Sequence, residues 1–154
     1  MVGMGDEGSG PAVVVTGDHE LGRVGACRGG MWCWRNDDSM AVVTADGSVA
    51  IIDVGGRTLT VVRHDGQAAA PVAWSGGLLF ASERSDALDV VEVAIRGEMA
   101  ESAGRRWSHA DFAWDPTVSA DGELVPWHEW DLAPMSWTAS GIVVARRSDG
   151  PGPG

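Results

Sequence analysis

Three tryptophans and two carboxylates in the last third of the chain form the residue group best suited to binding a ligand. Trp127, Trp130 and Trp137 lie close in sequence to Glu129 and Asp131. Because aromatic faces and carboxylates both attract cations, such a group could hold the free α-amino group of a peptide. In this hypothesis Glu129 and Asp131 contact the amine, and Trp130 and Trp137 form the walls. The alternative is that these side chains belong only to the core and the solvated surface.

The histidines offer weaker possibilities. None of the four stands in the H-E-x-x-H spacing that binds zinc on a helix. His109 with Asp111, and His128 with Glu129 and Asp131, could form a carboxylate-rich site, but polar residues in turns are usually only solvated. The four histidines are His19, His64, His109 and His128.

Patterns typical of catalysis or cofactor binding are missing from the sequence. It contains no G-x-S-x-G nucleophile elbow and no glycine-rich phosphate loop. Asp46-Gly47 and Asp121-Gly122 resemble fragments of calcium loops, but Asp-Gly is also the preferred pair of a type I′ hairpin turn. We therefore predict hairpins there, and no catalytic residue, metal or cofactor.

Composition narrows the class of protein. The 154 residues include 22 acidic and 11 basic side chains, a net charge of −11, which disfavours nucleic acid and anionic membranes as partners. No apolar run approaches the roughly 18–20 residues that span a bilayer. The first residues lack the pattern of a signal peptide, so a cytoplasmic location is expected. Cys27 and Cys33 are then expected to be ordinary thiols in a reducing compartment.

A repeat of 40 residues organises the chain. Trp34, Trp74 and Trp114 each end a triplet of a bulky residue, a small residue and tryptophan. A period of 40 is typical of β-propeller blades, each a four-stranded antiparallel sheet. We expect these three tryptophans to form repeated core between blades.

Short β-branched runs separated by glycine-containing turns lie between these markers. No long helix is expected; the best helical candidate, 98–107, is interrupted by Gly104 and is better explained as a strand or loop. The predicted strands are 40–43, 48–54 and 58–62 in the first unit, 71–74, 78–82 and 88–95 in the second, and 112–119, 123–130 and 141–147 in the third.

The third unit contains several recognisable sequence motifs. It reads Trp114-Asp115-Pro116, then Ser119-Ala120-Asp121-Gly122, and later Trp130-Asp131 and Met135-Ser136-Trp137. These motifs resemble those in the propeller of the prolyl oligopeptidase family of serine peptidases, in its acylaminoacyl-peptidase-like branch. The resemblance covers about residues 19–150. The Ser-x-Asp-Gly piece alone is shared with TolB-like propellers. Ala120 and Pro126 depart from the family pattern, and a proline in a strand is expected at an edge or a bulge.

The resemblance implies a fold and a function. The fold is all-β, a partial β-propeller of about three four-stranded antiparallel blades near 30–62, 71–107 and 112–147, between loose segments 1–18 and 151–154. In this family a Ser-His-Asp triad in a separate α/β-hydrolase domain cleaves peptides, and the propeller limits and guides access to it. This chain lacks the pattern of that domain, so no activity is expected from it alone.

The partners implied are a peptide substrate and the α/β-hydrolase domain. Three blades are fewer than the roughly four to eight of a closed propeller, so two apolar sheet faces are expected to stay open. The alternative function is therefore a stand-alone propeller-like protein-binding module that self-associates through those faces.

Overall fold

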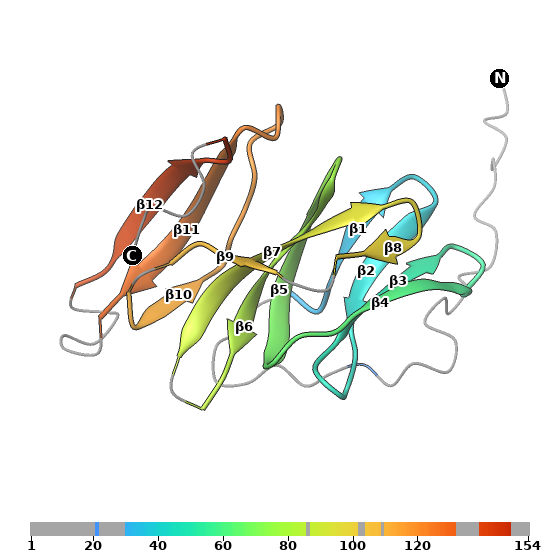
Figure 1. Cartoon of the computed structure of the whole chain (residues 1–154), viewed down its shortest axis with the longest axis horizontal. Coiled ribbons are helices and arrows are strands. Elements are labelled where there is room, and N and C mark those ends of the chain that lie inside the picture. The colour runs from blue at the N-terminus through green and yellow to red at the C-terminus, as the bar shows by residue number, and fades with distance from the viewer. Residues whose placement is uncertain are drawn as a thin grey trace, which may run out of the picture.

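The chain is an all-β protein. A computed structural model describes residue 21 and residues 30–85, 87–101, 104–108, 110–131 and 139–148. These residues form twelve strands and no helix, so the all-β prediction is confirmed for them (Figure 1). No helix in this part of the chain has the length and apolarity needed to cross a membrane. The predicted loose segments 1–18 and 151–154 lie outside the described residues.

The first four strands form an antiparallel sheet in chain order. They are β1 (Trp32–Asn36), β2 (Ser39–Val43), β3 (Val49–Asp53) and β4 (Thr58–Val62). The predicted strands 40–43, 48–54 and 58–62 are therefore confirmed to within a residue or so. β1, which contains the first tryptophan triplet, completes the sheet as an edge strand.

The remaining eight strands form one larger sheet. Its main path runs β12-β11-β10-β7-β6-β5, and β8 and β9 pair with β7. These strands are β5 (Gln67–Trp74), β6 (Gly77–Glu83), β7 (Leu88–Arg96), β8 (Met99–Ala100), β9 (Arg105–Arg106), β10 (Phe112–Trp114), β11 (Leu124–Trp130) and β12 (Gly141–Arg146).

One strand pairing joins two of the strand groups that were expected to be separate blades into a single sheet. β10 lies parallel to β7 at a single register position, Phe112 beside Leu88, and thereby extends the edge of β7 that also carries β8 and β9. The structure therefore has a four-stranded antiparallel sheet and a larger mixed sheet. β8 and β9 lie within 98–107, the segment that we predicted to be a strand or loop and not a helix.

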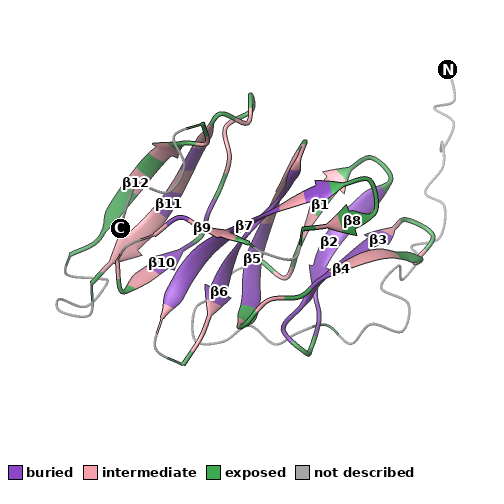
Figure 2. Ribbon diagram, viewed as in Figure 1, coloured by how far each residue is buried: buried purple, intermediate pink, exposed green. Residues whose placement is uncertain are grey.

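Two core clusters lie on the two faces of the middle strands β5–β7 (Figure 2). One cluster packs the first sheet, through side chains such as Val43 and Ile51, against Phe80 and Val93 of the middle strands. A second cluster packs the opposite face against β10–β12. Alternating side chains of one strand enter different clusters, as Phe80 and Leu79 do, because successive residues in a strand point to opposite faces.

Two Asp-Gly turns are built alike, but not as predicted. The Oδ1 atoms of Asp46 and Asp121 accept hydrogen bonds from the hydroxyl two residues earlier and the backbone N–H two residues later. These hydroxyls lower the pKa of both carboxyls. Only the glycines, Gly47 and Gly122, have positive φ, of 83° and 76°. A type I′ turn needs positive φ at both central residues, so that assignment was wrong, whereas the hairpins themselves are confirmed.

The predicted strand 112–119 ends early, at Trp114. Asp115 has φ of 51°, a left-handed conformation that breaks the extended chain, and Pro116 follows it. The segment after them still runs beside β11, where the Thr117 N–H donates to the Pro126 carbonyl at 2.9 Å. The ring nitrogen of Pro126 faces this loop and not β12, so its missing N–H leaves the β11–β12 ladder intact.

Candidate functional site

Glu129 lies near the end of β11 and is held by two donors. Its Oε2 atom accepts a hydrogen bond from the Trp127 indole N–H at 2.7 Å and from the Ser108 hydroxyl at 3.3 Å. The carboxylate is half-buried, and its other oxygen accepts no hydrogen bond from the described residues. One oxygen is thus fixed in place, whereas nothing in the described part of the chain donates to the other.

Asp131 follows the same strand and lies on the surface. Its Oδ1 atom accepts a hydrogen bond from the backbone N–H of Asp111 at 3.4 Å, which ties the end of β11 to the start of β10. The two predicted amine ligands, Glu129 and Asp131, therefore occupy the same end of the sheet.

Trp130 does not share that surface. Its ring stacks on Phe112 with centroids 5.4 Å apart and planes at 16°, and the His128 ring lies 5.0 Å away. Since neighbouring residues of a strand point to opposite faces, Trp130 and Glu129 lie on opposite sides of β11. The predicted wall at Trp137 lies outside the described residues.

The three repeat tryptophans occupy unequal environments. Trp114 is buried and Trp74 is half-buried beneath Arg147, whose Cζ atom lies 3.1 Å from the ring centroid. Trp34 is 54% exposed and meets Trp32 edge to face, with centroids 6.2 Å apart. The prediction that all three form core between blades is therefore wrong for Trp34. Trp34 borders a surface depression of about 450 Å³ at Arg35, Asn36 and Asp37.

A buried carboxylate that sequence analysis missed joins the middle and last strands. Glu92 of β7 accepts hydrogen bonds from the Trp107 indole at 3.0 Å and from Arg147 at 2.9 and 2.7 Å. Arg147 also donates to the Gly122 carbonyl, and Arg105 donates to the Arg147 carbonyl. These polar groups lie beside the second core cluster, where they fix one strand group against another.

A second ionic group surrounds Asp89 at the start of β7. Asp89, which is buried, accepts hydrogen bonds from Arg84 at 2.7 Å and from Arg106. Arg106 also binds both oxygens of Asp65, at 3.0 and 3.1 Å, and Arg84 lies 3.7 Å from the same carboxylate. The alternation of two aspartates and two arginines lets each charge face opposite charges.

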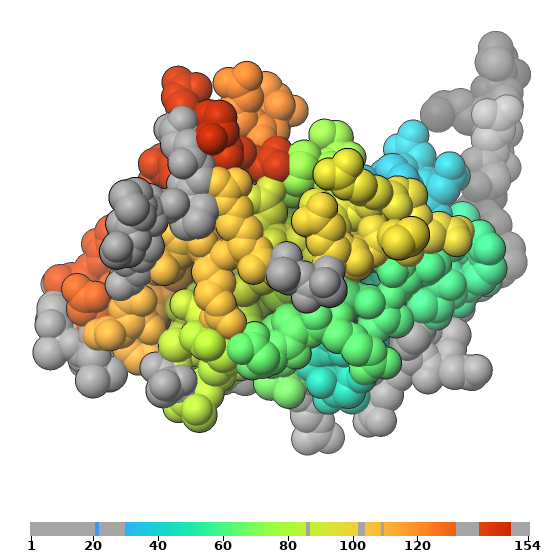
Figure 3. All heavy atoms as spheres, viewed as in Figure 1, coloured from blue at the N-terminus to red at the C-terminus, as the bar shows by residue number. Residues whose placement is uncertain are grey.

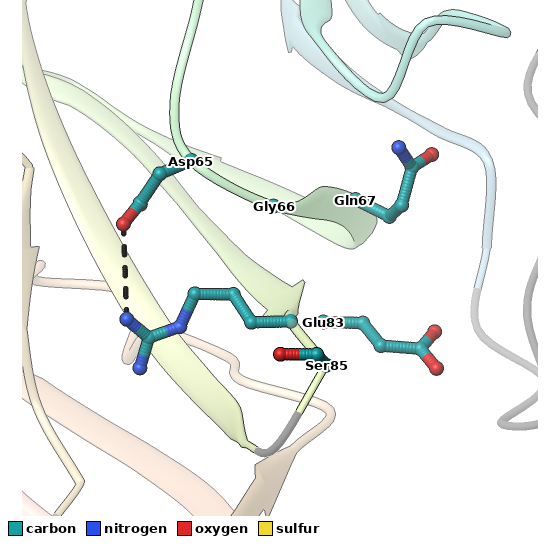
Figure 4. Close-up of a pocket in the computed structure, with 6 residues that line it drawn as sticks. Asp65, Gly66, Gln67, Glu83 and Ser85 are labelled. Atoms are coloured by element: carbon teal, nitrogen blue, oxygen red, sulfur yellow. Dashed lines mark ion pairs between the residues drawn. The ribbon is translucent and has the colours of Figure 1, made fainter.

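This ionic group borders an open depression of about 650 Å³ (Figure 4). Its lining consists of Asp65, Gly66, Gln67, Glu83, Arg84 and Ser85. The Asp65 carboxylate turns toward its ion pair, whereas the Glu83 and Gln67 side chains point away from it. The polar groups therefore do not converge on one point, as they would at a site that orients a small molecule.

A serine and a histidine are hydrogen-bonded to each other beneath this depression. The His64 Nδ1 atom lies 3.1 Å from the Ser82 hydroxyl, and its Nε2 atom lies 3.0 Å from the Gly47 carbonyl. A carbonyl can only accept, so Nε2 carries the proton and Nδ1 accepts from the serine. Ser82 is 0% exposed, and a Cβ atom added at Gly66 would lie 2.5 Å from its hydroxyl oxygen. This pair is therefore closed to a substrate.

Among the described residues, the other ionisable groups form neither a metal site nor a reactive thiol. No set of three or more His, Cys, Asp or Glu side chains in the described residues is arranged to hold a metal ion. Burial raises the pKa of the Cys33 thiol to about 11. The thiolate is the reactive form, so Cys33 is a poor nucleophile at neutral pH. Cys27 lies outside the described residues.

Comparison with known proteins gives no family. No protein-family model matches the chain, and no curated protein matches it.

Proposed function

We propose that this chain is a non-catalytic section of a β-propeller from a prolyl-oligopeptidase-like serine peptidase. The observation that carries the proposal is the order of packing. Consecutive antiparallel strands form groups in chain order (β1–β4, β5–β9 and β10–β12), and each group packs face to face against the next through one core cluster. Blades of a propeller pack in this way. The sequence motifs within residues 114–137 support the assignment to this family.

In this proposal the chain gates and positions a peptide for an α/β-hydrolase domain that supplies the nucleophile. The described residues offer no exposed serine–histidine pair of their own, because Ser82 is buried. Glu129 and Asp131 receive the α-amino group of the peptide at the end of β11. Trp137 is the wall of the site in this proposal, whereas Trp130, which stacks on Phe112 on the opposite side of β11, is left out of it.

The test is a reconstituted peptidase in which this chain is joined to a hydrolase domain of the proposed family. We expect Glu129→Gln to raise KM for a short peptide with a free amine about tenfold, the loss of roughly 1.4 kcal/mol of charge-assisted binding. The same peptide with an acetylated amine should be unaffected. Glutamine keeps an acceptor for Trp127, so the fold is preserved.

Glu123→Gln is the matched control, because Glu123 precedes the same strand but is exposed and pairs with Arg146. It should leave KM unchanged. An unchanged KM in Glu129→Gln, together with equal cleavage of long and short peptides, would refute the proposal.

The second candidate is a stand-alone binding module that self-associates. The specific observation in its favour is exposed apolar side chains on an edge strand of each sheet, Trp32 and Trp34 on β1 and Ile142 and Val144 on β12. In this candidate no hydrolase domain is needed, and the chain alone would form a defined oligomer.

A further inference from the structure

β12 is an edge strand with apolar side chains in solvent. It pairs with β11 along one edge, and no described strand pairs with its other edge. Ile142 is 70% exposed and Val144 is 55% exposed. The strand lies at one end of the molecule, with the first sheet at the other end (Figure 3).

The register decides which backbone groups of β12 face the open edge. The Arg147 N–H donates to the Glu123 carbonyl at 2.8 Å, so the odd-numbered residues of β12 bond to β11. Val144 lies opposite Pro126, whose carbonyl is turned the other way, toward Thr117. Because hydrogen-bonded and non-hydrogen-bonded pairs alternate in an antiparallel ladder, Ile142, Val144 and Arg146 present their N–H and C=O groups outward.

The usual protections of an edge strand are missing from β12. Its sequence, Gly-Ile-Val-Val-Ala-Arg, contains no proline, no lysine and no acidic residue, and its pairing with β11 is continuous, without a bulge. Natural sheets use these devices to prevent pairing between edges. The one charge, Arg146, lies 3.5 Å from Glu123 of its own chain.

We propose that the open edge of β12 pairs with β12 of a second copy of this chain. The two strands run antiparallel about a two-fold axis at Val143, which joins two copies of the larger sheet into one continuous sheet. In this register Ile142 of one copy lies directly opposite Val144 of the other, so the exposed apolar side chains cover each other in cross-strand pairs. The outward backbone groups of these residues form the hydrogen bonds of that pairing.

Charge favours the second copy at this edge over other parts of the surface. In the register at Val143, Arg146 lies opposite Ser140 of the second copy, and no like charges meet. The whole chain carries a net charge of −11, so two copies repel each other except where a surface lacks acidic side chains. Salt screens this repulsion but does not weaken apolar contact, so the dimer should tighten as the salt concentration rises.

This inference locates the surface for the self-association of the second candidate function, and it does not depend on the peptidase proposal. The test is the molar mass of the full chain in solution by light scattering, as a function of protein and salt concentration. We expect a monomer–dimer equilibrium that shifts toward dimer in salt. Val144→Lys should weaken the dimer by at least tenfold, since it places a charge at the centre of the pairing.

Two further variants make the result specific. Val144→Pro removes an outward N–H and none of the N–H groups that bond to β11, so it should also yield a monomer. Met99→Lys adds the same charge at an exposed apolar residue of β8 and should dimerise like the unaltered chain. A far-ultraviolet circular dichroism spectrum like that of the unaltered chain shows that each variant is folded.

A chain that stays monomeric at every protein and salt concentration overturns the inference and the second candidate together. A dimer that survives both Val144→Lys and Val144→Pro overturns the inference alone, because the copies then associate through a different surface. Neither result bears on peptide binding at Glu129.

Discussion

His64 is a half-buried histidine whose proton binding is coupled to folding. It links the first sheet to the middle strands, because its ring bonds to the Gly47 carbonyl on one side and the Ser82 hydroxyl on the other and packs 4.8 Å from Phe80. Burial lowers its pKa below the ordinary value of 6.5, despite the opposing hydrogen bond to Gly47. The folded protein therefore favours the neutral imidazole.

This shift predicts a loss of stability in mild acid. Below pH 6.5 the unfolded chain binds a proton at His64 before the folded chain does, so the free energy of unfolding falls as the pH decreases. Urea unfolding at pH 7.5, 6.5 and 5.5 measures the decline. Carboxyl groups with lowered pKa values, such as that of Asp46, change the free energy of unfolding only at pH values near and below 3.8. That range lies well below the one in which His64 titrates.

His64→Gln serves as the control, because glutamine keeps hydrogen-bonding capacity but does not titrate. The variant should be less stable at pH 7.5 and should lose much of the decline between pH 6.5 and 5.5. The same slope in both proteins would contradict the assignment to His64.

Sequence could identify candidate polar residues but not their partners. His64 and Ser82 are 18 residues apart, and only the pairing of β5 with β6 after the 63–66 loop brings them together. The separation of Glu129 from Trp130 was accessible from sequence, because two neighbours within one predicted strand must point to opposite faces. Trp130 therefore drops out of the proposed amine site, whereas Glu129 and Asp131 stay in it and Trp137 lies outside the described residues.

At the scale of the elements, the hairpin between β5 and β6 leaves no room for a side chain at Gly77. A Cβ atom added at Gly77 would lie 2.2 Å from the carbonyl oxygen of Val93 on β7. That oxygen belongs to the backbone of a buried strand and cannot turn aside. Glycine is therefore required here for close approach of two strands.

Gly77→Ala should lower the free energy of unfolding by about 1–3 kcal/mol, the usual cost of forcing an added methyl group into packed structure. The measurement is urea unfolding followed by tryptophan fluorescence. Gly141→Ala is the matched control, because a Cβ atom there meets nothing within 4 Å and φ is not positive. A loss of stability at Gly141 equal to that at Gly77 would contradict this account.

The strands were more predictable than their ends. Glycine-containing turns such as Ala45-Asp46-Gly47 and Ser75-Gly76-Gly77 separate β-branched runs, and strands were found on both sides of each. The segment 112–119 was predicted as one strand because its composition suits a strand. The left-handed conformation of Asp115 depends on the path of the chain, which must bring the Thr117 N–H to the Pro126 carbonyl. Amino-acid composition does not reveal such a path.

At the scale of the whole molecule, one buried carboxylate connects parts of the chain that are distant in sequence. Glu92 and Arg147 are 55 residues apart, and their side chains are 7% and 19% exposed. A charge held there needs its partner, because water reaches it poorly. The pair therefore makes the position of the last strands depend on the middle ones.

Glu92→Ala should destabilise the protein by about 3 kcal/mol, since it leaves the Trp107 N–H and the Arg147 guanidinium without their acceptor. Urea unfolding provides the measurement. Glu123→Ala removes an exposed partner of Arg146 and should cost less than about 1 kcal/mol. Equal losses in the two variants would show that Glu92 acts as an ordinary surface charge.

The all-β class could be predicted from composition and periodicity. The pairing of β10 with β7, which joins two strand groups into one sheet, could not. A 40-residue repeat predicts equal units, and equal units suggest separate sheets. The contact of Phe112 with Leu88 depends on how β8 and β9 leave part of the β7 edge uncovered, which is a property of the folded whole. For the same reason the exposure of Trp34 could not be inferred from its repeat position.

The alternation of backbone direction along β12 has a consequence for the exchange of amide hydrogens with solvent. The N–H groups of Val143 and Ala145 are bonded within the sheet, whereas those of Ile142 and Val144 face outward. Exchange along this strand should therefore be slow and fast at alternate residues. Anything that pairs with the open edge would slow the fast set and leave the slow set unchanged, so the strand itself records whether its edge is occupied.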